Sequence, residues 1–502
     1  MRALLSVWDK TGLVELAGGL HELGWALIAS GGTYAALAEA GLPVTAVEDV
    51  TGSPEMLGGR VKTLHPAIHG GILADRSKPE HVADLDAQGI GAIDLVVCNL
   101  YPFPSQPSIE MIDVGGPTMV RAAAKNHAHV GVVVDPADYG PVLDELRAGG
   151  ALSDRTRRRL ARAAFAHTAA YDAAVVGWFD SVGDGAGLPP TVHLALERAG
   201  ELRYGENPHQ DAARYRVTGA PGFWDEVVQH GGMALSYLNL ADADAAWHLV
   251  HDLGSAAPAA VIVKHANPCG VAVAEDIATA YERAFECDAM SAFGGIVALN
   301  RPVDEDLAAE MVANPKADVV IAPSWSEGAL ALFGAKRKNT RLLSAPPRPA
   351  DRLHLRPLAD GWLVQQPYRF GAERAAWQVV SRARPTDEQW ADLELAWRVC
   401  AHVKSNAIVL AAGGMAVGIG AGQQNRVDPG ELAVRKAAGR AKGGACASDA
   451  FFPFRDGLDM VAAAGVAAVV EPGGSMRDDE VVAAADEHGI ALVFTGERQF
   501  RH

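Results

Sequence analysis

Residues 2–40, RALLSVWDKTGLVELAGGLHELGWALIASGGTYAALAEA, decide the fold of the first part of the chain. The stretch alternates short apolar runs with segments whose apolar residues recur at helical spacing. Strands are expected at residues 2–8, 25–29, 94–100 and 130–134, and helices at residues 13–23 and 33–40. Strands that alternate with helices form a parallel sheet covered by helices on both faces. The polar loops then follow the carboxyl ends of the strands, where open α/β sheets bind ligands.

Length and charge limit the classes of function. The chain has 502 residues, 49% of them hydrophobic and 21% charged, and a formal net charge of −17. This length predicts roughly two to four domains. The negative charge argues against duplex nucleic acid or an anionic membrane as the main partner, because both require a basic surface. An anionic small molecule held by a local cluster of Lys and Arg remains compatible with it.

The cysteines indicate a reducing compartment. They are scattered and form no C-x-x-C pair: Cys98, Cys269, Cys287, Cys400 and Cys446. This pattern is typical of reduced cysteine, and it predicts neither a disulfide framework nor a zinc site. The opening apolar run, residues 3–7, is too short for a signal peptide, and no apolar run is long enough to span a bilayer. We therefore expect a cytoplasmic protein.

A linker is expected between two domains. Helical spacing extends over residues 154–179, and GDGAGLPP follows at residues 183–190. Glycines break a helix and prolines prevent it from re-forming, so this segment is the expected linker. The expected domains are residues 1–182 and residues 191–502, and the second is also of the α/β class.

The second domain contains a faint repeat. VKH at residues 263–265 is echoed by VKS at 403–405, and SAF at 291–293 by SDAF at 448–451. An apolar strand that ends in proline also occurs twice, at 319–323 and 466–472. We interpret these echoes as two similar lobes, roughly residues 191–360 and 361–502. Chance similarity between two α/β segments is the alternative, because the spacings differ.

A first candidate site begins at Ser30-Gly31-Gly32-Thr33, between an expected strand and an expected helix. Two glycines let backbone N–H groups approach an anion, and the hydroxyls can help to cradle a phosphate. Lys10 could add positive charge from the neighbouring loop. A turn with Ser30 or Thr33 as helix cap is an equal alternative.

A long polar loop, residues 51–71, adds further ionisable groups. It contains Arg60-Val61-Lys62-Thr63-Leu64-His65-Pro66 and His69. Long loops in compact domains are usually functional or disordered. Tyr101, Asp113 and Lys125 follow, and in a parallel sheet we expect them to converge on one rim. Taken singly, each has a structural alternative: a core-edge tyrosine, a turn-forming aspartate and a solvated helix lysine.

A second candidate site lies at Val263-Lys264-His265-Ala266-Asn267-Pro268-Cys269-Gly270. An apolar strand, residues 259–263, delivers a lysine and a histidine side by side before a loop. A cation beside an imidazole at a strand's end suits proton transfer at a carbonyl group.

Three other segments of the second domain are dense in recognition-capable side chains. In residues 203–210, RYGENPHQ, Arg203 could clamp a phosphate and Tyr204 could stack on a ring, with a polar turn as the alternative. The glycine-rich residues 418–426 lack the dinucleotide fingerprint, so no nicotinamide site is expected. Residues 448–456 bring three aromatics together, either as core packing or as a slot for a flat heterocycle. Gly473-Gly474-Ser475 offers backbone donors.

Four motifs together resemble a known family: KTLHP at 62–66, DVGGPT at 113–118, VKHANPCG at 263–270 and SDAFFPFRD at 448–456. They are similar to the bifunctional purine-biosynthesis enzymes that couple AICAR formyltransferase to IMP cyclohydrolase, and the resemblance runs almost end to end. It implies an N-terminal methylglyoxal-synthase-like domain followed by a transformylase of two cytidine-deaminase-like lobes. It also implies formyl transfer from 10-formyltetrahydrofolate to AICAR, which gives FAICAR and tetrahydrofolate. Cyclisation of FAICAR to IMP with loss of water would follow.

The resemblance also implies roles for single residues. In the cyclohydrolase, Lys62 and Tyr101 would steady the developing oxyanion while Lys125 and Asp113 move protons. In the transformylase, His265 would be the base, Lys264 would stabilise the oxyanion and Asn406 would contact the substrate. Nucleotide contacts in the first domain would be Lys10, Ser30, Gly31, Gly32, Thr33, Arg60 and Thr63. Ribotide contacts in the second domain would be Arg203, Tyr204, Gly294, Asp318, Phe451 and Arg498. Positions near the ribotide or the folate would be Arg426, Asp456, Ser475 and Met476.

Two features depart from simple patterns. Trp8 stands where a small serine is expected in the first phosphate loop, so one hydroxyl contact would be lost. The lobes lack the H-x-E and P-C-x-x-C set of zinc deaminases, of which Pro268-Cys269 is only a fragment, so no metal is expected. The resemblance implies a homodimer whose transformylase site is built across the interface. A requirement for a monovalent cation is left open.

Other classes of function remain as alternatives. The first domain could be a regulatory nucleotide-binding module without cyclohydrolase activity, which Trp8 favours and the set Lys125, Tyr101 and Asp113 disfavours. A zinc nucleotide deaminase is disfavoured by the missing ligands. A purely structural protein is disfavoured by the clustered ionisable loops.

Overall fold

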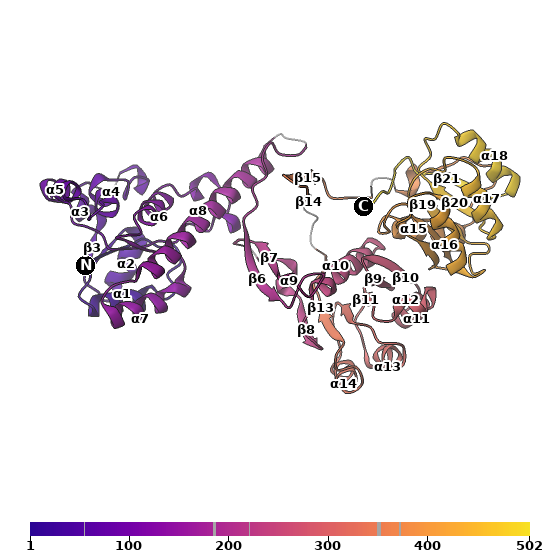
Figure 1. Ribbon diagram of the computed structural model, residues 1–502, viewed down its shortest axis with the longest axis horizontal. Helices are drawn as coiled ribbons and strands as arrows, with labels where there is room; N and C mark the ends of the chain where they lie inside the picture. The colour runs from indigo at the N-terminus through magenta and orange to yellow at the C-terminus, as the bar shows by residue number, and fades with distance from the viewer. Residues whose placement is uncertain (55, 184–186, 220, 349–352, 371–372) are drawn as a thin grey trace. The chain divides into compact units, whose positions relative to one another are not determined.

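The computed structural model describes the chain except for residues 55, 184–186, 220, 349–352 and 371–372 (Figure 1). It divides into two compact units. One unit comprises Met1–Glu197 with Arg216–Ala220, and the other comprises Arg198–Tyr215 with Pro221–His502. Residues 184–186 of the expected linker lie outside the described residues.

The first unit is built on a five-stranded sheet in the order β3-β2-β1-β4-β5, with every neighbouring pair parallel. The strands are β1 (Arg2–Leu5), β2 (Ala26–Ala29), β3 (Val44–Ala46), β4 (Leu95–Val97) and β5 (Gly131–Val133). The parallel α/β sheet expected from the alternating pattern is confirmed. The sequence pattern did not reveal β3, because this edge strand is short and none of its residues is fully buried.

The helices of the first unit connect these strands. They are α1 (Leu13–Glu22), α2 (Gly31–Glu39), α3 (Val47–Thr51), α4 (Pro66–Leu73), α5 (Pro79–Ala87), α6 (Gly115–Lys125), α7 (Tyr139–Gly149) and α8 (Asp154–Val182). Short 3₁₀ turns lie at Leu57–Gly59, Phe103–Ser105, Ile109–Met111 and Pro136–Asp138.

Helix α4 corrects the expectation of an unbroken loop over residues 51–71. Pro66 occupies the first helical position, where its missing N–H costs nothing. His65 caps the helix, because its Nδ1 accepts a hydrogen bond of 3.1 Å from the backbone N–H of Ala67. His69 lies within the helix, and burial lowers its pKa. Neither histidine therefore belongs to an open loop.

The second unit is built on a 12-stranded mixed sheet in the order β16-β21-β20-β19-β17-β18-β10-β9-β11-β12-β13-β8. Its strands are β8 (Val228–Gly231), β9 (Ala259–Lys264), β10 (Asn267–Val273), β11 (Ile296–Leu299), β12 (Val319–Ala322), β13 (Arg341–Ser344), β16 (Gln378–Val379), β17 (Ile408–Ala412), β18 (Met415–Gly420), β19 (Ala445–Ser448), β20 (Ala468–Glu471) and β21 (Ala491–Phe494). The helices are α9 (Phe223–Glu226), α10 (Tyr237–Asp252), α11 (Ile277–Cys287), α12 (Ala289–Ala292), α13 (Glu305–Ala313), α14 (Glu327–Lys336), α15 (Asp387–Cys400), α16 (Val427–Ala437), α17 (Asp456–Ala463) and α18 (Asp478–His488).

The 12-stranded sheet consists of two halves with the same topology. The strand orders β13-β12-β11-β9-β10 and β21-β20-β19-β17-β18 match, and the halves meet where β10 pairs antiparallel with β18. Each half begins with a long helix, α10 or α15, followed by an antiparallel hairpin, β9–β10 or β17–β18. This topology supports the interpretation of two similar lobes over chance similarity.

The structural register of the repeat differs from two of the sequence echoes. Strand β9 corresponds to β17, so VKH at 263–265 ends a strand whereas VKS at 403–405 precedes one. SAF at 291–293 begins in α12, whereas Ser448 ends β19, so this echo is also wrong. The third echo holds, because β12 and β20 occupy equivalent places in the two halves.

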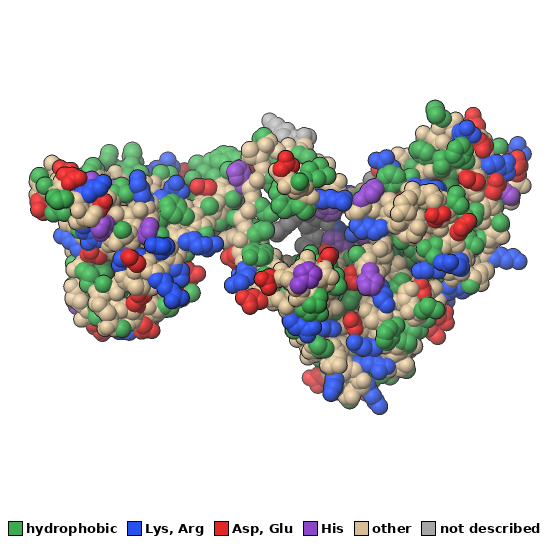
Figure 2. Space-filling view, viewed as in Figure 1, with side chains coloured by type: hydrophobic (Ala, Val, Ile, Leu, Met, Phe, Trp, Pro, Cys, Tyr) green, Lys and Arg blue, Asp and Glu red, His purple; other side chains and the backbone are tan. Residues whose placement is uncertain are grey.

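Two small two-stranded sheets complete the described elements. They are formed by β6 (Leu196–Leu202) with β7 (Ala212–Val217), and by β14 (His354–Pro357) with β15 (Trp362–Gln365). None of the helices in the described part of the chain combines the length and the apolarity that a bilayer crossing needs. On the face that Figure 2 shows, Lys and Arg side chains are interspersed with Asp and Glu.

Candidate active sites

The loop after β2 in the first unit forms an anion-binding corner. Ser30 precedes α2, and Gly31 adopts a φ of 48°, in the left-handed region. A β-carbon at Gly31 would lie 3.4 Å from Lys62 Nζ, and one at Gly32 would lie 3.7 Å from Lys10 Nζ. Two ammonium groups therefore meet the positive end of the α2 dipole, where backbone N–H groups favour an anion.

The hydroxyls of this corner hold its backbone in place. Thr33 Oγ1 accepts a hydrogen bond of 2.9 Å from the N–H of Val7 and donates one of 3.1 Å to the carbonyl of Val7. Ser30 Oγ lies 3.1 Å from Ser6 Oγ, and Ser30 makes no side-chain cap bond to α2. Backbone N–H groups and lysines are therefore the donors that an anion would meet.

Trp8 sits beside the same corner. Its ring makes an edge contact with Tyr101, with the ring centroids 5.2 Å apart. Asn99 Oδ1 accepts hydrogen bonds from the N–H of Trp8 at 2.7 Å and of Asp9 at 2.9 Å. Sequence reasoning missed Asn99, because the strand expected at residues 94–100 contained it, whereas β4 ends at Val97.

Asp113, Tyr101 and Lys62 form an electrostatically coupled group. Burial raises the pKa of Asp113, although hydrogen bonds from backbone N–H groups oppose the shift. Burial and the nearby Asp113 charge raise the pKa of Tyr101, while the Lys62 ammonium opposes this change. A carboxyl group, a phenol and an ammonium so arranged can exchange protons and stabilise negative charge on a ligand.

Tyr171 on α8 fixes the backbone of Asp113. The N–H of Asp113 donates to Tyr171 Oη at 2.7 Å, and Tyr171 Oη donates to the carbonyl of Met111 at 2.6 Å. Asp113 Oδ1 in turn accepts from the N–H of Gly116 at 2.8 Å, near the start of α6. Nothing local in the sequence pointed to Tyr171, because it lies 58 residues from Asp113.

Lys125 does not lie with Asp113, Tyr101 and Lys62. The expectation that it would converge with Tyr101 and Asp113 on one rim of the sheet is therefore wrong. Asp113 precedes the first residue of α6, whereas Lys125 is the last residue of the same helix. A helix of this length is about 16 Å long. The helix carries the chain from the carboxyl end of β4 back toward the start of β5, because parallel strands require such a return. Lys125 therefore lies at the opposite edge of the sheet.

Thr63 and Arg60 lie on the segment that carries Lys62. Thr63 is buried, and a β-carbon at Gly115 would lie 2.9 Å from its Oγ1. Arg60 is exposed and pairs with Glu110 at 2.5 Å. Thr63 is thus brought to the start of α6, whereas Arg60 is held outward by Glu110.

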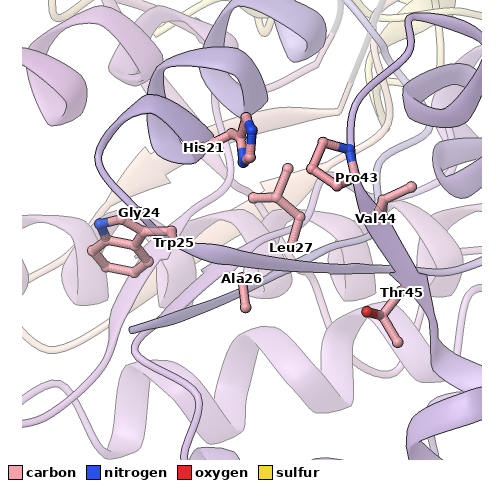
Figure 3. Close-up of a pocket in the computed structure, with 8 residues that line it drawn as sticks. All are labelled: His21, Gly24, Trp25, Ala26, Leu27, Pro43, Val44 and Thr45. Carbon is pink, nitrogen blue, oxygen red and sulfur yellow. The ribbon is translucent and has the colours of Figure 1, made fainter.

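A separate surface hollow of about 480 Å³ lies at the amino ends of β2 and β3 (Figure 3). Its lining includes Trp25, Leu27 and Val44, and the only titratable lining side chain is His21. The anion-binding corner follows the carboxyl end of β2 instead. The hollow is therefore distinct from the candidate site.

In the second unit, Lys264 and His265 stand at a tight turn. The expected loop is a turn of two residues, because β9 ends at Lys264 and β10 begins at Asn267. His265 and Ala266 have φ values of 54° and 59°. Lys264 Nζ donates a hydrogen bond of 2.8 Å to the carbonyl of Phe293, while His265 is exposed. The turn therefore presents an imidazole beside a held ammonium group.

Strand register brings the other candidates of the first lobe to this turn. Ile296, at the start of β11, pairs with Val263 of β9 and with Val319 of β12. Gly294 and Asp318, which precede β11 and β12, therefore lie at the same edge of the sheet as His265. Asp318 pairs with Lys316 at 2.8 Å.

The second lobe contributes to the same edge. Ile408 of β17 pairs with Gly420 of β18 and Ser448 of β19, so residues just outside these positions are neighbours. Asn267 bridges the lobes: its Oδ1 accepts from the N–H of Lys404 at 3.0 Å, and its Nδ2 donates to the carbonyl of His265 at 3.2 Å. One edge of a single sheet thus carries Lys264, His265, Gly294, Asp318, Asn406, Arg426, Phe451, Ser475, Met476 and Arg498.

Arg426 has a largely buried side chain that holds other residues of this edge in place. Its guanidinium donates to Asn406 Oδ1 at 2.7 Å and to Ser448 Oγ at 3.2 Å, and it pairs with the fully buried Asp449. Because its side chain is only 10% exposed, its donors serve the protein. Arg426 therefore positions Asn406, and its expected contact with a ligand is indirect.

The segments after β19 and β20 present exposed side chains. Glu471 ends β20, is fully buried and accepts a hydrogen bond of 2.7 Å from the N–H of Phe452. Burial raises the pKa of Glu471 to about 8. Phe451 is 40% exposed, and Met476 is fully exposed. Apolar side chains at this edge of the sheet are therefore exposed and can contact a ligand.

Other members of the expected set make local contacts. Asp456 Oδ1 accepts from the N–H of Gly457 at 2.8 Å, and Ser475 Oγ accepts from the N–H of Arg477 at 3.1 Å. The Arg498 guanidinium lies 4.4 Å from the centroid of the Phe500 ring. These three residues are at element ends, with polar groups that remain within reach of a ligand.

Arg203 and Tyr204 follow β6 in the hairpin with β7. The Arg203 guanidinium lies 5.0 Å from the centroid of the Tyr204 ring and donates to Tyr204 Oη at 3.2 Å. A hollow of about 370 Å³ beside this hairpin is lined by Gly205, Gln210 and Tyr237, among others. The pair thus combines a cation and an aromatic ring directly before Gly205, which lines the hollow.

Comparison with protein families shows which family the chain resembles. Residues 123–436 match the family described as AICARFT/IMPCHase bienzyme, and residues 12–127 match the MGS-like domain. The first match covers more than half of the 502 residues.

The chain belongs to the AICARFT/IMPCHase bienzyme family.

The bienzyme transfers a formyl group to AICAR and cyclises the product to IMP in purine biosynthesis. Its fold is the MGS-like domain followed by the AICARFT/IMPCHase domain, as the resemblance implied. A solved structure described as the crystal structure of ForH is 44% identical over 36% of this chain and 98% of its own length, with a TM-score of 0.34. No group of three or more metal-ligating side chains was found in the described part of the bienzyme.

Proposed function

We propose that formyl transfer takes place at the edge of the 12-stranded sheet, with 10-formyltetrahydrofolate as the donor. The observation that carries this proposal is the meeting of candidates from both lobes around the β9–β10 turn. His265 and Lys264 come from the first lobe, and Asn406 comes from the second. Chemistry at this place can use a base, a cation and an amide together.

His265 is the proposed base and Lys264 the proposed oxyanion stabiliser. The 5-amino nitrogen of AICAR bonds to the formyl carbon, and its proton passes to His265 directly or through the substrate's carboxamide. The bond from the formyl carbon to the folate nitrogen then breaks, and a proton is returned to that nitrogen. A base of this kind contributes roughly 10²–10⁴-fold, and loss of one oxyanion donor costs about 3–4 kcal/mol.

The remaining residues of this edge are proposed to hold the two substrates. Asn406, positioned by Arg426, orients the ribotide. The proposed ribotide contacts are Arg203, Tyr204, Gly294, Asp318, Phe451 and Arg498. The proposed folate contacts are Asp456, Ser475 and Met476. Exposed aromatic and thioether side chains suit the flat rings of both substrates.

Cyclisation is proposed to take place in the first unit. The phosphate binds at Ser30-Gly31-Gly32-Thr33 with Lys10, Thr63 and, after release from Glu110, Arg60. The carboxamide nitrogen attacks the formyl carbon, and water then leaves. Lys62 and Tyr101 stabilise the developing negative charge, and Asp113 moves protons. Lys125 is left out of this set, because α6 carries it to the opposite edge of the sheet.

The setting of the enzyme is also a proposal. We place it in the cytoplasm as a homodimer, with domain boundaries at 1–182 and 191–502. The five cysteines are all buried and free, which suits a reducing compartment. A monovalent cation is not assigned to any residue.

The test compares His265→Ala with wild type in IMP formation from AICAR and 10-formyltetrahydrofolate. Loss of the base is expected to slow formyl transfer by at least about tenfold. Cyclisation of supplied FAICAR should be unchanged, because that site lies in the other unit. His354→Ala, at an exposed histidine that begins β14, is the matched control. Formyl transfer by His265→Ala at the wild-type rate would remove His265 from the mechanism.

A further inference from the structure

The β9–β10 turn adopts a backbone that its own residues disfavour. His265 and Ala266 both lie in the left-handed region, with φ values of 54° and 59°. Turns of two residues with this geometry strongly prefer Asn or Gly, because a β-carbon clashes with the following carbonyl oxygen. Something outside the turn must therefore hold it.

Asp242 on α10 supplies this hold. Its Oδ2 accepts a hydrogen bond of 3.1 Å from the N–H of His265, and its Oδ1 accepts one of 2.7 Å from the N–H of Ala266. Both consecutive N–H groups of the turn thus point at one carboxylate. Hydrogen bonds to a charged acceptor are among the stronger ones in proteins.

The second lobe provides an internal comparison. Asp392 is the sixth residue of α15, as Asp242 is the sixth residue of α10. Asp392 accepts hydrogen bonds of 3.0 and 2.9 Å from the N–H groups of Gly413 and Gly414, in the β17–β18 turn. Both lobes therefore share a clamp, in which one aspartate carboxylate accepts hydrogen bonds from two consecutive N–H groups of the hairpin turn. The clamped turn is Gly413-Gly414 in the second lobe and His265-Ala266 in the first.

We propose that Asp242 is a positioning residue for formyl transfer. Two glycines adopt the left-handed turn without steric penalty, so the second-lobe turn does not depend on its clamp for this conformation. In the first lobe the same backbone is combined with a histidine and an alanine. Asp242 keeps this turn closed, so that the imidazole stays beside the Lys264 ammonium. The inference rests on the proposed role of His265 as base.

The first experiment compares Asp242→Asn with wild type and with Asp244→Asn, a control two residues along the same helix. Asparagine keeps an oxygen at only one of the two carboxylate oxygen positions, so one N–H of the turn would face an NH2 donor. The turnover number of formyl transfer is expected to fall by at least about tenfold, and up to the order of 10²-fold, because small misplacements of a catalytic group are costly. The KM for AICAR should change by less than about threefold, and Asp244→Asn should have a turnover number within about twofold of wild type. A wild-type turnover number for Asp242→Asn would overturn the proposal.

A double-mutant cycle separates positioning from general destabilisation. In a His265→Ala background, Asp242→Asn should slow the residual transfer by less than about twofold, because the group it positions is gone. An undiminished effect in that background would overturn the proposal. If His265→Ala itself transfers formyl groups at the wild-type rate, the proposed function fails, and the positioning role falls with it.

A second variant covers the case in which Asp242→Asn does not fold. Ala266→Gly removes one steric penalty of the turn, so the double variant Asp242→Asn/Ala266→Gly should fold and regain most of the lost turnover number. Folding is checked by circular dichroism, with Ala266→Gly alone as the reference. A folded double variant that stays as slow as Asp242→Asn would show that Asp242 does not act through the turn.

Discussion

At the scale of single residues, burial shifts the pKa of the groups that could transfer protons. Asp113 lies beside Tyr101 and near Lys62, and its pKa is raised mainly because burial disfavours the charged carboxylate. Such a carboxyl group keeps its proton at pH values where an exposed aspartate has lost it. That property suits a group that must exchange protons with a substrate near neutral pH.

Replacing Asp113 should separate activity from stability. Asp113→Asn is expected to slow cyclisation of FAICAR by at least about tenfold, because the proton-transfer group is lost. In the wild type, the unfolding free energy falls as the pH rises from the ordinary value of 3.8 through the raised pKa, because the folded state resists ionisation. Asparagine does not ionise, so this decrease in unfolding free energy is removed. Its side-chain carbonyl can still accept the hydrogen bond from the N–H of Gly116, so the unfolding free energy at neutral pH should not fall below that of wild type.

The measurements are FAICAR turnover and urea unfolding of the first unit over this pH range. Lys125→Ala is the control, expected to cyclise within about threefold of wild type, because Lys125 lies at the far end of α6. A Lys125→Ala variant as slow as Asp113→Asn would contradict this assignment.

At the scale of elements, the two hairpins use one design with different turn residues. Gly413 and Gly414 have φ values of 61° and 81°. A β-carbon at Gly413 would meet no atom within 4 Å, whereas one at Gly414 would lie 2.9 Å from the carbonyl oxygen of Val273 in β10. Gly414 is therefore constrained by backbone conformation and by close approach, and Gly413 by conformation only.

These two glycines form a matched pair of substitutions. Gly413→Ala should cost about 1–3 kcal/mol of unfolding free energy, because a non-glycine residue is strained in the left-handed region. Gly414→Ala should cost more, because the backbone at the junction of β10 and β18 must also shift. Denaturant unfolding of the full chain, followed by a probe of the second unit, measures both. Equal losses would show that the contact with Val273 is relieved without cost.

At the scale of the whole molecule, the candidate residues for the two reactions lie in separate compact units. The candidate cyclisation residues lie within Met1–Glu197, and the formyl-transfer residues lie within Arg198–Tyr215 and Pro221–His502. Each site is built on the edge of its own sheet. A defect in one site should therefore leave the other intact.

Mixing two inactive variants should restore the overall reaction. His265→Ala retains the cyclisation site, and Asp113→Asn retains the transfer site. Each alone should make little IMP from AICAR, whereas an equimolar mixture should make it after a lag in which free FAICAR accumulates. IMP appearance and FAICAR concentration are followed together. A mixture that makes no more IMP than the two separate proteins would mean that the intermediate does not pass between them.

Local patterns in the sequence were enough for the family and for several elements of the first unit. Apolar periodicity predicted the strands at 2–8 and 25–29 and the parallel sheet, because each strand and helix encodes its own period. Family motifs identified Lys264, His265 and Asp113 as candidate site residues. Strand β3 and helix α4 were not predicted, because their apolar periodicity is weak over such short segments.

Only the tertiary structure decided which distant residues meet. It placed Lys125 at the opposite end of α6 from Asp113, corrected the register of the repeat, and brought Asp242 and Tyr171 to the backbones of His265 and Asp113. These contacts join residues 23 and 58 positions apart. They depend on strand pairing and helix direction, which are properties of the folded chain that no short stretch of sequence contains.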